Sequence, residues 1–403
     1  MAKKHNKPDP LMPVYRRFDV AFERGEGAYL FDVKGARYLD FASGIAVTAL
    51  GHSHPHLVKA LNEQGAKLWH TSNLFQIPLQ EKLAERLTEA TFADNVFFTN
   101  SGVEAIECAL KLARKYHHAK GDEKRYRVIT FINAFHGRSL AAIAASGKKK
   151  LIEGFGPMPD WFDFVPFIDI DALKAVISDK TAAILIEPVQ GEGGILPAKK
   201  EQLQRLREIA DEHGLLLIFD EIQCGMGRSG KLFAHEWADV TPDIMAVAKG
   251  IGGGFPIGAC LARASVGEAL SAGSHGTTYG GNPLAMAVGN AVLDVILEEG
   301  FLDHVQEITK TLMTGLNKLK QRYPGLITDV RGLGLMIGVE CSVKIRPLIA
   351  RGLELGLVLT PSGENILRLL PPLIIEDSHI SEALEKLDQI FAEVKLKRAR
   401  TKA

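Results

Sequence analysis

The stretch Asp243-Ile244-Met245-Ala246-Val247-Ala248-Lys249-Gly250 decides the fold, because a short apolar run ends abruptly in a lysine. A run of this length and composition is typical of a buried strand. The segment 250–258 that follows is rich in glycine, which lets a backbone turn tightly around a ligand. Residues 215–220 repeat the pattern, with five apolar residues before Asp220. We therefore expect two buried strands that each end in a charged side chain.

Outward from these two runs, the chain alternates apolar strands with amphipathic helices. Further strands are expected at 96–99, 127–132 and 182–187, and helices at 103–116 and 200–213. Such strands indicate a mainly parallel sheet covered on both faces. We expect an α/β fold with a large domain over residues 66–285. A smaller α+β domain is expected from both chain ends, residues 1–65 and 286–403.

Composition limits the class of protein. The 403 residues are 46% hydrophobic and 24% charged, with 48 basic and 48 acidic side chains. This balance gives no support for a nucleic-acid or membrane partner. Four scattered cysteines without a CxxC pair, and an amino terminus without a signal peptide, favour the cytoplasm. No metal is expected, because His52, His54 and His56 surround Pro55 without a nearby acidic partner.

Small residues follow the first expected strand of the large domain. Ser101, Gly102 and Val103 open a helix, and free backbone N–H groups at a helix start bind anions such as phosphate. The alternative is that Ser101 is only the helix N-cap, with Glu104 completing a capping box. The sequence alone leaves both readings open.

Residues after the other strands suggest a flat, charged ligand. Phe135 can stack on a planar ring or simply join the core, and Arg138 can bind a carboxylate. The buried Asp220 needs a partner, which can be a protonated pyridine nitrogen, a cation or a metal. Burial of Lys249 lowers the pKa of its amine, as imine chemistry requires. A GxGxxG dinucleotide motif is excluded because position 255 is Phe255.

As an ordered set, the motifs resemble the class III aminotransferases of pyridoxal-phosphate (PLP) fold type I. The motifs are Asn100-Ser101-Gly102, Phe135-His136-Gly137-Arg138, Glu187-Pro188-Val189-Gln190-Gly191-Glu192-Gly193-Gly194, Asp220-Glu221-Ile222-Gln223, Lys249-Gly250 and Thr278-Tyr279-Gly280-Gly281-Asn282-Pro283. The resemblance extends from about residue 15 to residue 387. It implies the PLP-dependent transferase fold type I and pyridoxal 5'-phosphate as cofactor.

The resemblance also implies roles for single residues. Lys249 would carry the cofactor and move the proton, and Asp220 would bind the pyridine nitrogen. The remaining cofactor contacts would be Gln223 at the phenolic oxygen, Phe135 and Ile222 on the two ring faces, and Ser101, Gly102 and Val103 at the phosphate. Thr278 would reach the phosphate from the partner subunit of a homodimer with shared active sites.

For the substrates, the resemblance implies that Arg368 binds the shared α-carboxylate and Arg138 a second carboxylate. Glu192 would pair with an active-site arginine for one substrate and release it for the other. Thr277 is a further substrate-side candidate without an assigned role. The implied reaction moves the δ-amino group of N-acetylornithine, or of succinyl-diaminopimelate, to α-ketoglutarate. Another ω-aminotransferase or a PLP aminomutase is the alternative; Ile45, which cannot donate a hydrogen bond, disfavours free ornithine.

Overall fold

A seven-stranded sheet builds the large domain of the computed structural model, which describes residues 10–402 and the side chains of residues 10–398. Its strand order is β4 (Asn95–Thr99), β12 (Gly258–Ala262), β11 (Ile244–Val247), β10 (Leu216–Asp220), β7 (Thr181–Ile186), β5 (Arg127–Phe131) and β6 (Phe162–Val165). Strand β12 runs antiparallel to both of its neighbours. The other pairings are parallel, so the predicted mainly parallel sheet is confirmed.

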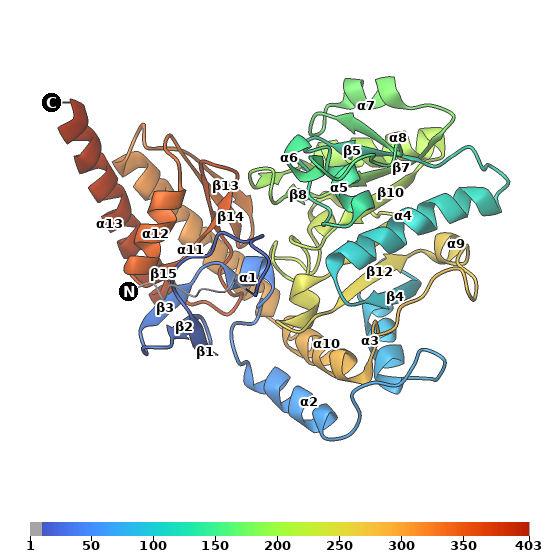
Figure 1. The fold of residues 1–403 in the computed structure, drawn as a ribbon, viewed down its shortest axis with the longest axis horizontal. Coiled ribbons are helices and arrows are strands. Elements are labelled where there is room, and N and C mark those ends of the chain that lie inside the picture. The colour runs from blue at the N-terminus through green and yellow to red at the C-terminus, as the bar shows by residue number, and fades with distance from the viewer. Residues whose placement is uncertain (1–9, 403) are drawn as a thin grey trace.

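Successive side chains of each strand point to opposite faces, and a helix covers each face. Ile218 and Ala246 share a core with helix α4 (Gly102–Ala119). Leu217 and Phe219 share a second core with helix α8 (Lys200–His213). Gly214 ends α8 in the left-handed conformation, with φ 62°. Figure 1 shows this layered domain on the right.

The small domain is built from both chain ends, as predicted. One sheet has the order β1 (Phe22–Glu26), β2 (Tyr29–Asp32), β3 (Arg37–Asp40) and β15 (Leu357–Val358), so β3 and β15 join the two ends. A second sheet has the order β13 (Ile327–Leu333), β14 (Met336–Cys341), β17 (Ile366–Leu369) and β16 (Thr360–Ser362). Helices α11 (Phe301–Arg322), α12 (Arg346–Glu354) and α13 (Asp377–Lys402) pack around them.

The remaining elements are short or connect these layers. They are α1 (Ser43–Ala46), α2 (Pro55–Gly65), α3 (Pro78–Glu89), α5 (Leu140–Ser146), α6 (Lys149–Ile152), α7 (Ile170–Val176), β8 (Val189–Gln190), β9 (Leu196–Pro197), η1 (Ala234–Ala238), η2 (Lys249–Gly252), α9 (Ala264–Gly267) and α10 (Pro283–Ile296). Among the described residues, no helix is long and apolar enough to span a membrane.

The packing of helices α2 and α10 concerns the position of the boundary between the two domains. Helix α10 packs against α2 and α3. Leu57 of α2 and Val292 of α10 belong to one core with β4, β11 and β12. Because α2 and α10 pack with the large domain, domain boundaries before α2 and after α10 fit these contacts better than boundaries at residues 65 and 285. The division into domains itself stays a prediction.

Two histidines have acidic partners that the sequence did not suggest. Nε2 of His52 lies 2.8 Å from Oδ2 of Asp40, and Nε2 of His56 lies 2.7 Å from Oδ2 of Asp294. Asp294 is distant in sequence and is brought near by the packing of α10 on α2. The expectation that these histidines lack acidic neighbours was therefore wrong.

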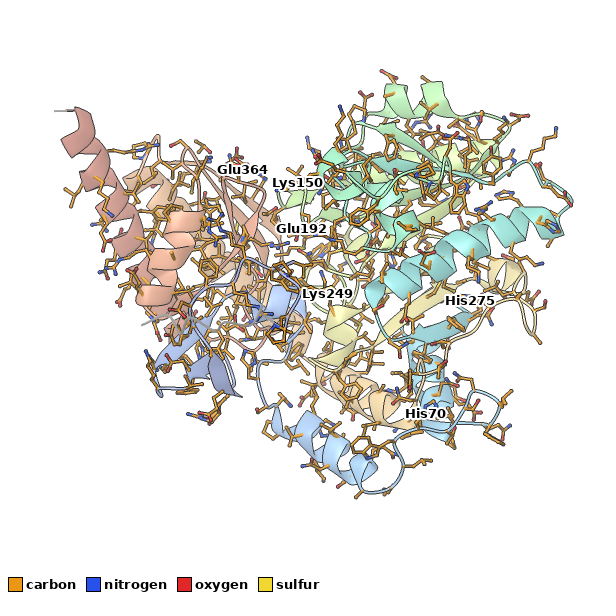
Figure 2. All side chains as sticks on the ribbon, viewed as in Figure 1. His70, Lys150, Glu192, Lys249, His275 and Glu364 are labelled. Atoms are coloured by element: carbon orange, nitrogen blue, oxygen red, sulfur yellow. The ribbon has the colours of Figure 1, made fainter. Side chains whose placement is uncertain are left out.

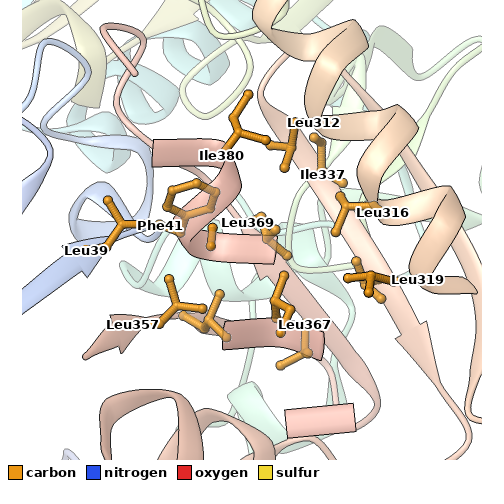
Figure 3. Packing of buried hydrophobic residues seen from close by; sticks show 14 of the residues in the cluster. Leu39, Phe41, Leu312, Leu316, Leu319, Ile337, Leu357, Leu367, Leu369 and Ile380 are labelled. Carbon is orange, nitrogen blue, oxygen red and sulfur yellow. The ribbon is translucent and has the colours of Figure 1, made fainter. Parts of the chain in front are cut away.

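The small-domain core offers a test of the packing (Figure 3). Leu312 of α11 is fully buried there, whereas Leu396 of α13 is 61% exposed. Leu312→Ala should lower the free energy of unfolding by about 2–5 kcal/mol, because it removes buried methyl groups and leaves a cavity. Urea unfolding followed by circular dichroism measures this. Leu396→Ala is the matched control, expected within about 0.5 kcal/mol of wild type; equal loss in both variants would contradict the packing.

Candidate active site

The ends of β10 and β11 bring two charged side chains to one edge of the sheet. The strands pair in parallel with Asp220 opposite Ala246, and Lys249 follows β11 after the single residue Ala248. A cavity of about 340 Å³ opens at this edge. Its wall contains eight of the predicted residues, namely Ser101, Gly102, Val103, Phe135, Asp220, Ile222, Gln223 and Lys249. Figure 2 shows Lys249 between the two domains.

Asp220 is held in place by two hydrogen bonds. Its Oδ1 accepts the backbone N–H of Ile222 at 3.1 Å, and its Oδ2 lies 2.8 Å from Nδ1 of His136. Because an ionised carboxylate can only accept, His136 is the donor. Both side chains are buried. His136 was quoted within a motif, but its role as a partner of Asp220 was missed; its place directly after Phe135 was the available signal.

Lys249 occupies an unusual backbone conformation, with φ 52°. Positive φ is costly for a residue with a side chain and is found at functional sites. Burial, and to a lesser extent the positive charge of Arg368, lowers the pKa of its amine to about 8. The carboxylates of Asp220, Glu192 and Glu187 act in the opposite direction. The lowered pKa keeps a larger share of the amine neutral and nucleophilic at physiological pH.

At the start of α4, Ser101 is the helix N-cap and also lies in the wall of the cavity. Its Oγ accepts the backbone N–H of Glu104 at 3.4 Å, so Ser101 is the N-cap. Glu104 turns back to accept the backbone N–H of Asn100 at 2.6 Å. The N–H groups of Gly102 and Val103 lie in the first turn, which has no internal acceptors. The cap therefore leaves an anion site in the cavity wall available.

Close packing explains two glycines around this turn. A Cβ on Gly102 would lie 2.8 Å from Cδ1 of Ile222. A Cβ on Gly137, whose φ is 127°, would lie 2.5 Å from Cγ2 of Val103. Neither position tolerates a side chain without movement of the cavity wall.

The small domain supplies a buried arginine. Nη1 of Arg368, in β17, lies 2.5 Å from Oε1 of Glu192 and 3.2 Å from Oε1 of Gln223. Its Nε donates to Oγ1 of Thr360 at 3.4 Å. The predicted residues Arg368, Glu192 and Gln223 thus form one cluster, with Gln223 reaching the cavity wall.

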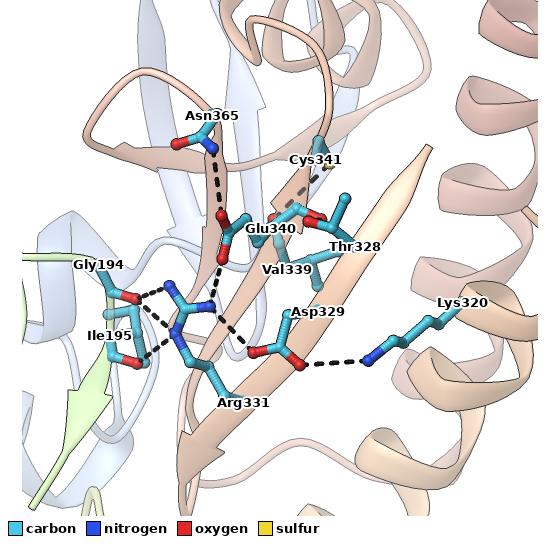
Figure 4. Close-up of polar contacts among 10 residues, drawn as sticks. All are labelled: Gly194, Ile195, Lys320, Thr328, Asp329, Arg331, Val339, Glu340, Cys341 and Asn365. Carbon is cyan, nitrogen blue, oxygen red and sulfur yellow. Dashed lines mark hydrogen bonds and ion pairs between the residues drawn. The ribbon is translucent and has the colours of Figure 1, made fainter. Parts of the chain in front are cut away.

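A second arginine anchors the loop that carries Glu192. Arg331 of β13 donates to the backbone carbonyls of Gly194 and Ile195, at 2.8 Å and 3.1 Å. Its Nη1 binds Asp329 and Glu340 at 3.0 Å and 2.6 Å (Figure 4). The sequence offered no signal for this contact, because the partners are more than a hundred residues apart.

Besides Glu192 and Arg368, three further predicted residues lie apart from the cavity wall. Arg138 is exposed, with its guanidinium carbon 5.7 Å from the centre of the Phe135 ring. Thr278 is exposed. Thr277 has a local role, since its Oγ1 accepts the backbone N–H of Gly280 at 3.1 Å. Its Oγ1 also accepts from Nδ2 of Asn100 at 3.4 Å.

The cavity fits pyridoxal phosphate. Its wall offers a helix start for a phosphate, an aromatic ring and a branched side chain for a flat ring, and a buried carboxylate for a pyridine nitrogen. A lysine amine with lowered pKa stands in the same wall for covalent attachment. Within the described residues, no group of three or more His, Cys, Asp or Glu side chains is arranged for a metal.

The lowered pKa of Lys249 can be measured directly. In the cofactor-free protein, the reactivity of the amine should rise with pH through a midpoint of about 8 and level off above it. Arg368→Gln should raise this midpoint, because it removes a nearby positive charge and frees Glu192. Competitive labelling with acetic anhydride and mass spectrometry of the Lys249 peptide measures it. Arg138→Gln is the control; a wild-type midpoint near the ordinary 10.5 would contradict the structure.

Sequence comparisons agree on one family. The model of the class III aminotransferases matches residues 12–391. An acetylornithine aminotransferase from Mesorhizobium japonicum is 58% identical over 377 residues, 94% of each chain. Another from Agrobacterium fabrum is 57% identical over 391 residues, 97% of this chain and 98% of the relative.

Solved structures agree as well. N-acetylornithine aminotransferase from Stenotrophomonas maltophilia is 38% identical with a TM-score of 0.83, over 95% of this chain and 98% of that one. Ornithine aminotransferase from Toxoplasma gondii, crystallised with oxidised glutathione and with partial PLP occupancy, is 32% identical with a TM-score of 0.92, over 96% and 94%. The chain, with its Lys249 at the end of a buried parallel strand, belongs to the class III aminotransferases.

Proposed function

We propose that this aminotransferase moves the δ-amino group of N-acetylornithine to α-ketoglutarate, a step of arginine biosynthesis. The observation that carries the proposal is the Glu192–Arg368 ion pair beside Gln223 in the cavity wall. With this pair, a single pocket could bind two unlike substrates, because Arg368 would stay paired with Glu192 for one substrate and be released to bind a carboxylate of the other. The names of the two relatives above support N-acetylornithine as the donor.

The proposed cofactor is pyridoxal phosphate, which when bound supplies an electron sink for the carbanion left by proton removal. Lys249 would hold it covalently, Asp220 would bind the ring nitrogen, and Gln223 the phenolic oxygen. Phe135 and Ile222 would contact the ring, and Ser101, Gly102 and Val103 the phosphate. All of these residues lie in the cavity wall, which supports the assignment.

Proton transfer at the substrate carbon needs a base with a pKa near the working pH. The Lys249 amine, with its pKa of about 8, meets this requirement once it is free of the cofactor. Asp220 must keep its negative charge toward the ring nitrogen. His136 supports this by donating to Oδ2, which leaves Asp220 oriented by two hydrogen bonds.

The ion pair accounts for dual substrates. An ω-amino donor reacts at the end remote from its α-carboxylate. Arg368 would therefore stay with Glu192 while the donor is bound, which departs from the expectation that Arg368 binds the α-carboxylate of both substrates. α-Ketoglutarate carries a carboxylate next to the reacting carbon, and Arg368 would leave Glu192 to bind it. The side chain of Glu192 is 30% exposed, so its carboxylate could turn toward solvent when Arg368 leaves it. Arg138 would bind the other carboxylate.

Free ornithine is the second candidate donor. The high TM-score of the Toxoplasma gondii ornithine aminotransferase favours it at the level of fold. Ile45 argues against it, since an isoleucine offers no hydrogen bond to a free α-amino acid group. An aminomutase is disfavoured by Arg368, because that reaction has no external dicarboxylate to bind.

We further propose a cytoplasmic homodimer with shared active sites. The four cysteines are all buried and free, as in proteins of a reducing compartment. Exposed apolar side chains cluster before α3, with Leu74 87% and Phe75 68% exposed. Asn73 in this segment donates to the carbonyl of Gly280 at 3.0 Å, which ties the segment to the loop of Thr278. In the proposed dimer, a partner subunit would cover this surface, and Thr278 would reach the phosphate site of that partner subunit.

The donor can be identified in a half-reaction without keto acid. Cofactor-loaded protein is mixed with N-acetylornithine, ornithine or γ-aminobutyrate, and the visible absorbance and released aldehyde are followed. We expect N-acetylornithine to react at least about tenfold faster than the others, since discrimination of this size needs only about 1.4 kcal/mol. Lys249→Ala is the control and should give no turnover. A faster reaction with ornithine would move the proposal to that donor.

The dimer can be tested by sedimentation velocity. Phe75→Glu should shift the protein toward monomer, because it places a charge in an apolar interface. Leu396→Glu, at another exposed leucine, is the control and should leave the mass unchanged. Thr278→Ala should keep the dimer but weaken pyridoxal phosphate binding. A monomeric wild type at micromolar concentration would refute shared sites.

A further inference from the structure

A row of four residues crosses the second sheet of the small domain. Arg331 of β13 lies opposite Gly338 of β14, and Gly338 lies opposite Arg368 of β17. Thr360 of β16 ends the row, opposite Arg368. Residues directly opposite each other in neighbouring strands point to the same face of a sheet. The two arginines therefore emerge on one face, with a single glycine between them.

The missing side chain at Gly338 leaves room for Ile195, the last residue of the loop 191–195. A Cβ at position 338 would lie 3.0 Å from Cβ and 3.2 Å from Cγ1 of Ile195. The side chain of Ile195 is fully buried, in a cluster that includes Val189 of the large domain and Met336 of the small domain. Because both domains pack on it, Ile195 has little space to turn away. Gly338 therefore determines how closely the loop approaches the sheet.

The backbone of this loop is held by the small domain at both ends. Ile195 has a φ of 53°, which is an outlier for a β-branched residue and persists only where surrounding contacts enforce it. Arg331 donates to the carbonyl oxygens of Gly194 and Ile195 (Figure 4). Oγ of Ser362, in β16, donates to the carbonyl oxygen of Gly191 at 2.8 Å. The contacts with the sheet thus fix the loop in a strained conformation.

Glu192 lies between the two ends of the loop. Its Oε1 accepts from Nη1 of Arg368 at 2.5 Å. Arg368 and Gly338 are neighbours in the same sheet, so the partner of Glu192 and the surface on which the loop rests belong to one element. A displacement of the loop from this surface would carry Glu192 with it and leave Arg368 behind. The position of the loop on the sheet therefore sets the geometry of the ion pair.

We propose that Gly338 is a positioning residue for the Glu192–Arg368 ion pair. It acts through Ile195, whose contact with the sheet fixes the height of the loop. Arg331 acts from the neighbouring strand by holding the carbonyl groups of the loop. The inference rests on the proposed exchange of partners by Arg368. Gly338 sets how readily Arg368 leaves Glu192, and with it the balance between ω-amino donors and an acceptor whose carboxylate lies next to the reacting carbon.

The experiment measures, by calorimetry, how tightly α-ketoglutarate binds to the cofactor-loaded protein without an amino donor, so that no amino group is transferred. Glu192→Gln should tighten binding about tenfold, because a neutral amide competes less well for the arginine. Gly338→Val should tighten it about three- to tenfold, because the displaced loop moves Glu192 away from Arg368. A general loss of structure would weaken binding, so the direction of the change separates positioning from a defect in folding.

A second comparison tests whether Gly338 acts through Glu192. In a Glu192→Gln background, Gly338→Val should change the affinity less than about twofold, because two changes that act on one contact are not additive. Gly338→Ala is a milder variant with the same expected direction and replaces Gly338→Val where valine prevents folding. Gly65→Ala, in α2, is the matched control: the nearest side-chain atoms lie 3.9 Å from the added Cβ, and binding should equal wild type.

The possible outcomes separate this inference from the proposed function. Unchanged or weaker binding in both Gly338 variants, with tighter binding in Glu192→Gln, would overturn the role of Gly338 alone. Equal tightening by Gly338→Val with and without Glu192 would also overturn it, since the effect would not pass through the ion pair. Unchanged binding in Glu192→Gln would refute the exchange of partners at Arg368, and the role of Gly338 with it. The identity of the amino donor is decided separately by the half-reaction.

Discussion

The parallel pairing of β10 with β11 is the constraint on which the site depends. Because the strands run side by side in the same direction, Asp220 and Lys249 leave the sheet at one edge, although 29 positions separate their numbers in the chain. A shift of one residue in this register would turn Asp220 to the opposite face and separate it from His136. The buried hydrogen bond between these two side chains therefore needs the sheet, and it also opposes such a shift. The antiparallel strand β12 continues the same sheet and carries Gly258, where a Cβ would lie 2.4 Å from the carbonyl oxygen of Ser101. The start of α4 can approach the cavity only because this position has no side chain.

The small domain completes the site through charged groups that bridge to the large domain. Arg368 brings a guanidinium that is almost fully buried, which is tolerated only with close acceptors. Glu192, Gln223 and Thr360 provide them. Arg331 fixes the loop of Glu192 by binding its carbonyls, so the carboxylate can move while its backbone stays in place. This arrangement suits the proposed exchange of partners by Arg368, because breaking the Glu192–Arg368 ion pair leaves the contact of Arg331 with the large domain intact. It also explains why Lys249 is sensitive to Arg368: any movement of that arginine changes the charge next to the amine.

Much of the fold could be predicted from the sequence, because the buried strands are apolar throughout and the helices carry clear periodicity. The predicted helix at 200–213 coincides with α8, and the predicted strand at 96–99 lies within β4. Strand β12 was missed because it consists mainly of small residues, whose size is explained only by the close approach of α4. Within the site, residues directly after strands were found, since their position in the chain is their position at the sheet edge. The roles of His136 as a partner of Asp220 and of Arg331 were not found, because they depend on contacts between segments far apart in sequence. The same holds for the acidic partners of His52 and His56.

Substrate choice cannot come from the fold, since solved enzymes for ornithine and for N-acetylornithine both match this chain over more than 90% of its length. It must come from few side chains around a common cavity, and charge is the property that differs among the candidates. Glu192 and Arg368 form an ion pair in this structure, and burial raises the pKa of the Glu187 carboxyl. Arg138, the other cation among the predicted substrate residues, is exposed and lies apart from the cavity wall. Recognition of a carboxylate in the proposed reaction would therefore depend on whether Arg368 stays paired with Glu192 or is released to a ligand, because a buried guanidinium without an acceptor is costly.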